Sequence, residues 1–193
     1  LSIMPAPLQK QLNVEVVKSA QLVDRNLTGL YGMGKVDGGH LFVAMEFVQG
    51  SSLARLIAQR REARRSLELR DVFTVIAHLT FALEKVHAGG LVHGVVTPYN
   101  ISISRRGVLK LSNLAFGRAT AEALLAQGEG PFSDSIYVAP ELTKLPAQSS
   151  PSSDVSPAVM LAKRPARSSP ASDVYSVAML AVELLSEEGL PSD

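Results

Sequence analysis

The sequence predicts an α+β fold in which helices predominate over a small sheet. Residues 8–23, and a longer segment from about Arg70, have apolar residues at the three- and four-residue spacing of helices. Residues 28–36 and 40–48 are predicted strands, because a hairpin turn signal lies between them. An apolar run within residues 165–187 predicts a buried helix. With 193 residues, 46% of them hydrophobic, the chain can form one domain with a core.

The first predicted helix has a single apolar stripe. The stripe consists of Leu8, Leu12, Val16, Ala20 and Val23. The two strands that follow are joined at residues 37–39, Asp-Gly-Gly, a common hairpin turn. Gly29, Gly32 and Gly34 precede this turn, and we assign them to strand packing or turns rather than to phosphate binding.

Residues 52–64 are predicted to form a short helix with arginines at its end. These are Arg60, Arg61, Arg64 and Arg65. A solvated basic face is the simpler interpretation, and a docking patch for an acidic partner is the alternative. The helix from about Arg70 should bury the stripe Val72, Ile76, Leu79, Leu83 and Val86. His78 and His87 lie on or near it without nearby acids, so we expect packed or surface histidines and no metal site.

A duplicated segment precedes the last predicted helix. Residues 146–162 (PAQSSPSSDVSPAVMLA) and 165–181 (PARSSPASDVYSVAMLA) share eleven identities in seventeen positions. Pro157 would interrupt a helix in the first copy, whereas the second copy has Ser172 as a plausible N-terminal cap. We therefore expect residues 143–164 to be a looped-out insertion, disordered because of its Ser and Pro content. A phosphorylation target or partner-docking loop is the alternative.

The composition excludes several classes of function. The 19 basic residues nearly balance the 18 acidic ones, so nothing favours a nucleic-acid partner. The absence of cysteine excludes disulfides and Cys-type metal sites and agrees with a cytoplasmic location. The longest apolar run, residues 177–185, is about half of the ~20 residues that cross a bilayer, so we expect no membrane span. The first residue is Leu rather than Met, which leaves the natural start and any targeting signal open.

Residues 93–100, HGVVTPYN, have the frame of a phosphotransfer loop without its acid. A protein-kinase catalytic loop has the pattern H-R-D-L-x-x-x-N, in which Asp accepts the substrate hydroxyl proton and Asn holds a metal. His93 and Asn100 keep this spacing, and Val95 stands in the position of the Asp. The segment therefore resembles a protein kinase but lacks the acid of ordinary kinase catalysis.

Four flanking motifs extend this resemblance in kinase order. They are the helix end FALEKVH at 81–87, the strand and hinge LFVAMEFVQGSSL at 41–53, the activation-segment end YVAPE at 137–141, and the helix start SDVYS at 172–176. Residues 8–187 thus resemble the protein-kinase-like superfamily, with a Ser/Thr protein kinase fold.

The resemblance implies a truncated two-lobe fold, with a mostly helical lower lobe and a partial upper-lobe sheet. Residues 8–48 resemble part of the upper lobe, and residues 49–142 the hinge, the lower-lobe helices, the degenerate catalytic loop and the activation segment. Residues 143–164 would be the insertion and 165–187 the buried lower-lobe helix. The Gly-rich loop, the lysine of V-A-I-K and the last helices are missing, so we expect a fragment or a reduced member. Glu15 matches the glutamate that pairs this lysine; without the lysine, we expect Glu15 on a solvated face.

The metal side of the site has also lost its acid. We align residues 113–115, Asn-Leu-Ala, with the D-F-G motif, because Asn113 follows Asn100 by the usual thirteen residues. An alternative register places residues 115–117 there, and neither register keeps the aspartate. Mg²⁺ prefers carboxylate oxygens, so Asn100 and Asn113 would be weak ligands at best, and a loop-capping role fits Asn100 equally well. We therefore expect no tight binding of Mg-ATP.

Other positions of the catalytic machinery differ from the family pattern as well. Positioned proton transfer contributes roughly 10²–10⁴-fold to rate, and Val95 cannot supply it. Thr97 stands in place of the lysine that touches the transferred phosphoryl, and Gly94 in place of the arginine that answers an activation-loop phosphate. Asp134 replaces the substrate-side threonine. The joint pattern is typical of a pseudokinase.

The resemblance assigns other residues to nucleotide binding. Met45 would guard the back of an adenine pocket, and the backbone of Glu46 and Val48 would face the adenine edge. Backbone contacts need no particular side chain, so adenine binding could survive, although an ordinary core role for Met45 and Val48 is an equal alternative.

The structural motif residues of the family are largely retained. They are His93, Ala139, Pro140, Glu141 and Asp173. The counterpart of Asp173 holds the catalytic-loop backbone, and that of Glu141 pairs with a later arginine that this chain does not contain.

These observations predict a catalytically inactive kinase-like domain that acts as a scaffold or allosteric module for a protein partner. Binding of ATP and Mg²⁺ is doubtful, and the oligomeric state is open. The main alternative is a divergent, weakly active Ser/Thr protein kinase that transfers the ATP γ-phosphate to protein hydroxyls. A product of gene decay is a third hypothesis. A small-molecule phosphotransferase is disfavoured, because such enzymes also need an acid in this loop.

Overall fold

The computed structural model describes residues 6–36, 41–65, 67–114, 136–143 and 168–186 and has the predicted α+β class. In chain order its elements are α1 (Ala6–Ala20), β1 (Leu30–Lys35), β2 (Leu41–Met45), β3 (Gly50–Ser52), α2 (Leu53–Glu62), α3 (Leu69–Ala88), the 3₁₀ turn η1 (Pro98–Asn100), β4 (Ile101–Ser104), β5 (Leu109–Leu111), α5 (Pro140–Thr143) and α7 (Pro170–Leu185).

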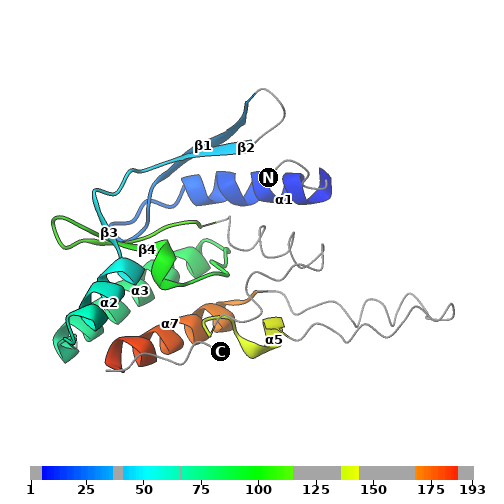
Figure 1. The fold of residues 1–193 in the computed structure, drawn as a ribbon. Helices are drawn as coiled ribbons and strands as arrows, with labels where there is room; N and C mark the ends of the chain where they lie inside the picture. Colours follow the sequence, from blue (N-terminus) through cyan, green and yellow to red (C-terminus); the bar gives the residue numbers. More distant parts are fainter. Residues whose placement is uncertain (1–5, 37–40, 66, 115–135, 144–167, 187–193) are drawn as a thin grey trace, which may run out of the picture.

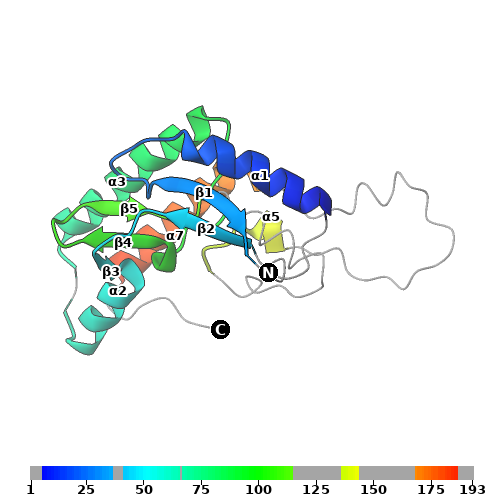
Figure 2. The ribbon, with the colours of Figure 1, turned by 90° about the horizontal axis from the view of Figure 1, so that it is seen from above.

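The elements are arranged in an upper and a lower part. In Figure 1 the antiparallel hairpin of β1 and β2 lies above α1, and the helices α2, α3 and α7 form the lower part. The second sheet, with strand order β3-β4-β5, lies between the two parts in Figure 1, and Figure 2 shows its three strands from above. An isolated bridge from Leu27 to Leu111 connects the segment after α1 to the edge of this second sheet.

The buried face of α1 differs from the predicted stripe. The helix ends at Ala20, and Val23 beyond it is 95% exposed. Glu15 was expected on a solvated face, but it is buried, with only 9% of its surface exposed. The reason is the helical spacing, because Glu15 lies three residues after Leu12 and four before Ser19, both of which are buried.

The hairpin of β1 and β2 has the predicted pairing. Gly34 faces Phe42 across the two strands, and a Cβ atom at Gly34 would lie 2.6 Å from two carbon atoms of the Phe42 ring. Only glycine leaves room for the ring to lie over this strand, which agrees with a packing role for Gly34.

The core of the lower part lies where α3 packs against α7 and the second sheet. Predicted members Val72, Leu79, Leu83 and Val86 of α3 are buried there. The helix α7 contributes Val177, Leu180 and Leu184. Its N-terminal cap is Ser169 rather than Ser172, and the side chain of each serine bonds to the backbone N–H of the other.

Two further predictions concern the insertion at residues 143–164 and the lack of a membrane span. Apart from Thr143, the proposed insertion at 143–164 lies outside the described residues. Among the helices that the structure describes, none is both long and apolar enough to cross a membrane.

Replacement of Leu180 by alanine should test whether the described core folds cooperatively. Leu180 is fully buried, so the free energy of unfolding should fall by about 2–5 kcal/mol. Urea denaturation followed by circular dichroism measures this change. The matched control is Val174→Ala on the same helix, where 62% of the side chain is exposed and the change should stay within about 0.5 kcal/mol. Equal effects, or a non-cooperative transition in the wild type, would contradict the described core.

Candidate functional site

The loop of residues 93–100 is held to the lower part by the carboxylate of Asp173, on the first turn of α7. This side chain is fully buried. Its Oδ2 accepts a hydrogen bond from the backbone N–H of His93 at 2.9 Å, and its Oδ1 accepts one from the N–H of Gly94 at 2.8 Å. A buried carboxylate needs such donors because desolvation otherwise disfavours its charge. Asp173 therefore fixes the start of the loop, in the role that the kinase resemblance assigned to it.

A third donor to Asp173 comes from α3. The Nε2 atom of His87 lies 2.8 Å from Asp173 Oδ2, and since a carboxylate only accepts, the imidazole donates. His87 had been described as lacking nearby acids, and this prediction is wrong. The acid is 86 residues away in sequence, so neighbouring residues gave no signal.

Gly94 has a backbone conformation that favours glycine. Its φ angle is +80°, in the left-handed region that side chains with a Cβ atom rarely occupy. This conformation directs its N–H to Asp173. The kinase pattern has arginine at this position. Glycine adopts the observed φ angle with less strain than any residue that has a Cβ atom.

The imidazole ring of His93 is neutral and forms two hydrogen bonds inside the loop. Its Nε2 donates to the carbonyl of Ser112 at 2.9 Å, and its Nδ1 accepts the N–H of Val95 at 3.3 Å. Complete burial lowers the pKa of His93 below its ordinary value, against the opposing influence of Asp173. The neutral ring can accept the Val95 N–H, and a protonated ring could not.

Val95 and Thr97, at the positions of the acid and of the phosphoryl-contacting lysine, are both buried. The side chain of Val95 carries no group that accepts a proton. Thr97 caps the turn η1 through its backbone, its carbonyl accepting the Asn100 N–H at 3.0 Å. Neither side chain can orient a substrate hydroxyl as the family acid does.

Asn100 and Asn113 are brought together by the fold, thirteen residues apart in sequence. The Nδ2 group of Asn113 donates to Asn100 Oδ1 at 2.6 Å. The Nδ2 group of Asn100 donates to the carbonyl of Val95 at 2.8 Å. Asn113 also has a positive φ of +67°, which asparagine adopts more readily than most residues. The alternative register, at residues 115–117, lies outside the described residues.

The side chains of Asn100 and Asn113 do not fit the Mg²⁺ ion that the kinase resemblance implies. The Asn100 oxygen that would face a metal already accepts a hydrogen bond, and both side chains are neutral amides. Among the described residues, no group of three or more His, Cys, Asp or Glu side chains could hold a metal ion. Asn100 and Asn113 therefore supply none of the charged oxygen ligands that magnesium prefers.

The predicted hinge is fastened by an ion pair. Glu46 Oε2 accepts the Gly29 N–H at 3.0 Å and lies 2.9 Å from the Lys110 Nζ atom. The bond from Gly29, with a smaller contribution from Lys110, holds the pKa of Glu46 below its usual value. The Glu46 N–H donates to the Gly29 carbonyl at 2.7 Å, so it extends the hairpin and is not free to contact an adenine. Of the other hinge residues, Met45 lines a small cavity with Leu30, and Val48 is half-buried.

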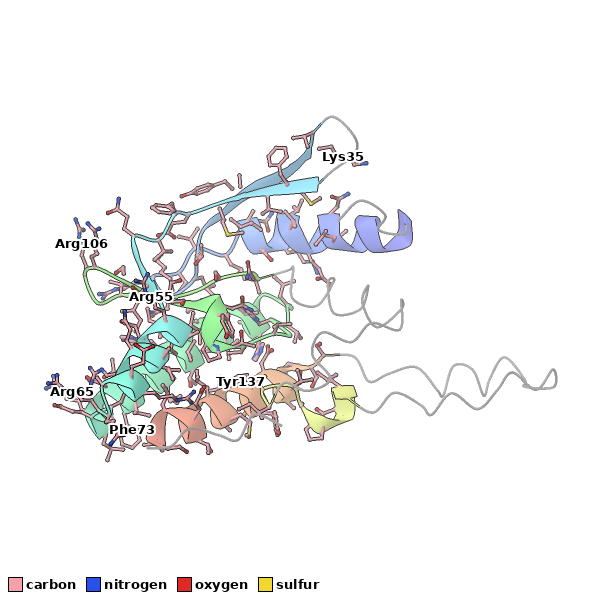
Figure 3. All side chains as sticks on the ribbon, in the orientation of Figure 1. Lys35, Arg55, Arg65, Phe73, Arg106 and Tyr137 are labelled. Atoms are coloured by element: carbon pink, nitrogen blue, oxygen red, sulfur yellow. The ribbon has the colours of Figure 1, made fainter. Side chains whose placement is uncertain are left out.

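The end of the activation segment is tied to α7. The hydroxyl of Tyr137 donates to Glu183, and Arg61 on α2 bonds the other oxygen of Glu183 at 2.8 Å. Burial and the Glu183 carboxylate raise the pKa of Tyr137. Figure 3 places Tyr137 beside α7 in the lower part. Arg61 is therefore not part of a purely solvated basic face, and sequence gave no sign of its partner.

The remaining predicted motif residues lie close to Tyr137. Ala139 is buried, and Pro140 and Glu141 begin α5 with exposed side chains. Asp134 lies outside the described residues.

Comparison with known proteins gives one family and several relatives. A family model described as the protein kinase domain matches residues 6–192. Serine/threonine-protein kinase PknL of Mycobacterium tuberculosis is 32% identical over 145 residues, which are 75% of this chain and 35% of that protein. A probable serine/threonine-protein kinase PknB of Lactococcus lactis is 26% identical over 127 residues, 66% of this chain and 20% of the relative.

Solved structures show the same fold. The PknI kinase domain of Mycobacterium tuberculosis superposes with a TM-score of 0.68 and 20% sequence identity, over 97% of this chain and 60% of that one. A C20A mutant of that domain gives a TM-score of 0.66. The chain spans about a third of the length of PknL and three fifths of the PknI structure.

Replacement of Asp173 by asparagine should destabilise the protein. The amide has one carbonyl oxygen for three donors, so at least one buried N–H loses its partner, at a cost of about 1–3 kcal/mol. Urea denaturation measures the loss. The control is Asp71→Asn on the exposed surface of α3, with an expected change within about 0.5 kcal/mol. A loss no larger than that of the control would show that Asp173 does not hold the loop.

Protonation of His93 should make stability depend on pH. Because burial depresses the folded-state pKa below 6.5, the unfolded state binds the proton first. The contribution of His93 is complete above about pH 6.5 and is lost as the pH falls below this value. Urea denaturation between pH 7.5 and 5 should show this loss in the wild type and in His78→Gln. It should be weaker in His93→Gln; an unchanged slope there would contradict the assignment.

Proposed function

Since this chain belongs to the protein kinase family, we propose that it is a catalytically inactive member that acts by binding a protein partner. The observation that carries the proposal is the hydrogen bond between the side chains of Asn100 and Asn113. In the kinase pattern these two positions supply metal oxygens, one of them a carboxylate. Here the neutral Asn113 amide donates to the Asn100 oxygen and the Asn100 amide donates to the carbonyl of Val95, which is buried at the position of the acid.

The balance of retained and lost interactions supports a binding role. The contacts that hold the loop, from Asp173 to His93 and Gly94, are complete. The groups that would handle a metal, a proton and a phosphoryl group are replaced by Asn113, Val95 and Thr97. The interactions that hold the loop are thus retained, and the side chains that would take part in phosphotransfer are replaced.

A weakly active Ser/Thr protein kinase remains the second candidate. Its specific support is the relationship to serine/threonine-protein kinase PknL, at 32% identity. It would require Asn113 to release Asn100 so that both carbonyl oxygens could turn toward a metal. It would also require another group to take the role that Val95 cannot fill.

The first experiment is a thermal-shift titration with ATP on the longest natural form of the chain, with and without Mg²⁺ or Mn²⁺. A ligand that binds only the folded state raises the Tm. We expect no metal-dependent shift in the wild type or in Asn113→Ala. Asn113→Asp, which adds the missing carboxylate, should gain a metal-dependent shift.

A phosphotransfer assay with radiolabelled ATP and a generic protein substrate separates the two candidates. We expect no transfer above that of Asn100→Ala. Transfer by the wild type that Asn100→Ala abolishes would overturn the proposal and support the weakly active kinase.

A further inference from the structure

A groove opens on the lower part of the molecule, between α2, α3 and the turn from β4 to β5. Its volume is about 240 Å³. The buried residues that form its floor are Leu53, Ile57 and Leu109, and the half-buried residues of its walls are Leu56, Leu67, Val75 and Ile103. Small-molecule pockets measure roughly 300–1,000 Å³, so this groove suits one or two apolar side chains better than a whole small molecule.

Arginines lie at both ends of this groove. At one end Arg60 lines the groove, and Arg64 and Arg65 follow the last turn of α2. At the other end Arg105 and Arg106 occupy the tight turn in which Gly107 donates to the Ser104 carbonyl and lines the groove. Figure 3 shows Arg65 and Arg106 on the same edge of the molecule.

The balance of charge around the groove is positive. All five arginines are exposed. The acids closest in sequence to these arginines and to the groove lining are Asp71, which lines the groove, and Glu62 and Glu68, so five positive charges stand against three negative ones. For the whole chain the difference is only +1. Guanidinium groups bind carboxylates in paired hydrogen bonds, so an acidic ligand fits this rim.

We propose that this groove binds an acidic peptide segment of a partner protein. Apolar side chains of the peptide enter the groove between Leu56 and Val75, and its carboxylates bind the arginines at the two ends. The apolar floor supplies the contact area, and the arginines supply selectivity and a faster association. The groove shares no lining residue with the loop of residues 93–100 or with the hinge positions Met45, Glu46 and Val48, so the proposal holds for an active kinase as well as for an inactive one.

The test is a fluorescence-polarisation titration of the natural protein with a labelled ten-residue peptide. The probe has two central leucines, separated by one residue, and glutamates at both ends. We expect saturable binding that weakens with salt, because exposed charges are screened. Replacement of the glutamates by lysines, or of the leucines by serines, should each lower the affinity at least roughly tenfold.

Charge-reversal variants locate the site without changing the core. Arg105→Glu/Arg106→Glu should weaken binding of the acidic probe by roughly tenfold or more. The control, Lys18→Glu/Lys35→Glu, makes the same change in net charge on exposed residues of the upper part and should bind as the wild type does. Equal losses in both variants would reduce the effect to net charge and overturn the proposal.

Two threonines of α3 allow a matched steric test. Thr74 lines the groove and Thr80 does not, yet both are exposed and each hydroxyl bonds to the carbonyl four residues earlier. The helical rotation places them roughly 120° apart. Thr74→Trp should block the groove and abolish binding, whereas Thr80→Trp should leave it unchanged. Binding that survives Thr74→Trp, or no saturable binding by the wild type, would overturn the proposal.

Discussion

The carboxylate of Asp173 is fully buried, and donors from three residues far away in sequence converge on it. Two are backbone N–H groups of the loop that begins at His93, and the third is the ring of His87 on α3. These three hydrogen bonds stabilise the buried charge. Together they join the first turn of α7 to the loop and to α3. The positions of His93, Val95 and Asn100 all follow from this connection.

The hydrogen bonds of Asp173 do not involve the side chains at positions 95 and 113, where the kinase pattern has its acids. The fold therefore does not depend on those acids. Asp173 is bonded through the backbone of the loop and does not need the side chain at position 95. Val95 fills its position as an apolar residue, and Asn113 bonds Asn100 without a metal between them. Each replacement leaves the buried polar groups around it paired, which is the condition for a stable interior.

Sequence patterns predicted the features that depend on local spacing. The helices, the hairpin and the fold class follow from periodicity and turn residues, and the approach of Asn113 to Asn100 follows from the kinase pattern. The burial of Glu15 was missed because its exposure was inferred from the missing lysine, whereas helical spacing places Glu15 on the buried face with Leu12 and Ser19. The pairs His87–Asp173 and Arg61–Glu183 were missed because the partners are 86 and 122 residues apart in the chain. A single sequence does not show which residues so far apart come into contact in the fold.

The left-handed conformation of Gly94 limits which residues can follow His93 without a loss of stability. A residue with a Cβ atom at a φ of +80° costs roughly 1–2 kcal/mol relative to glycine. A residue with a Cβ atom at this position would therefore strain the backbone at the point where Asp173 accepts the N–H of residue 94. The identity of this residue is thus coupled to the anchor at Asp173, although its side chain takes no part in the hydrogen bond.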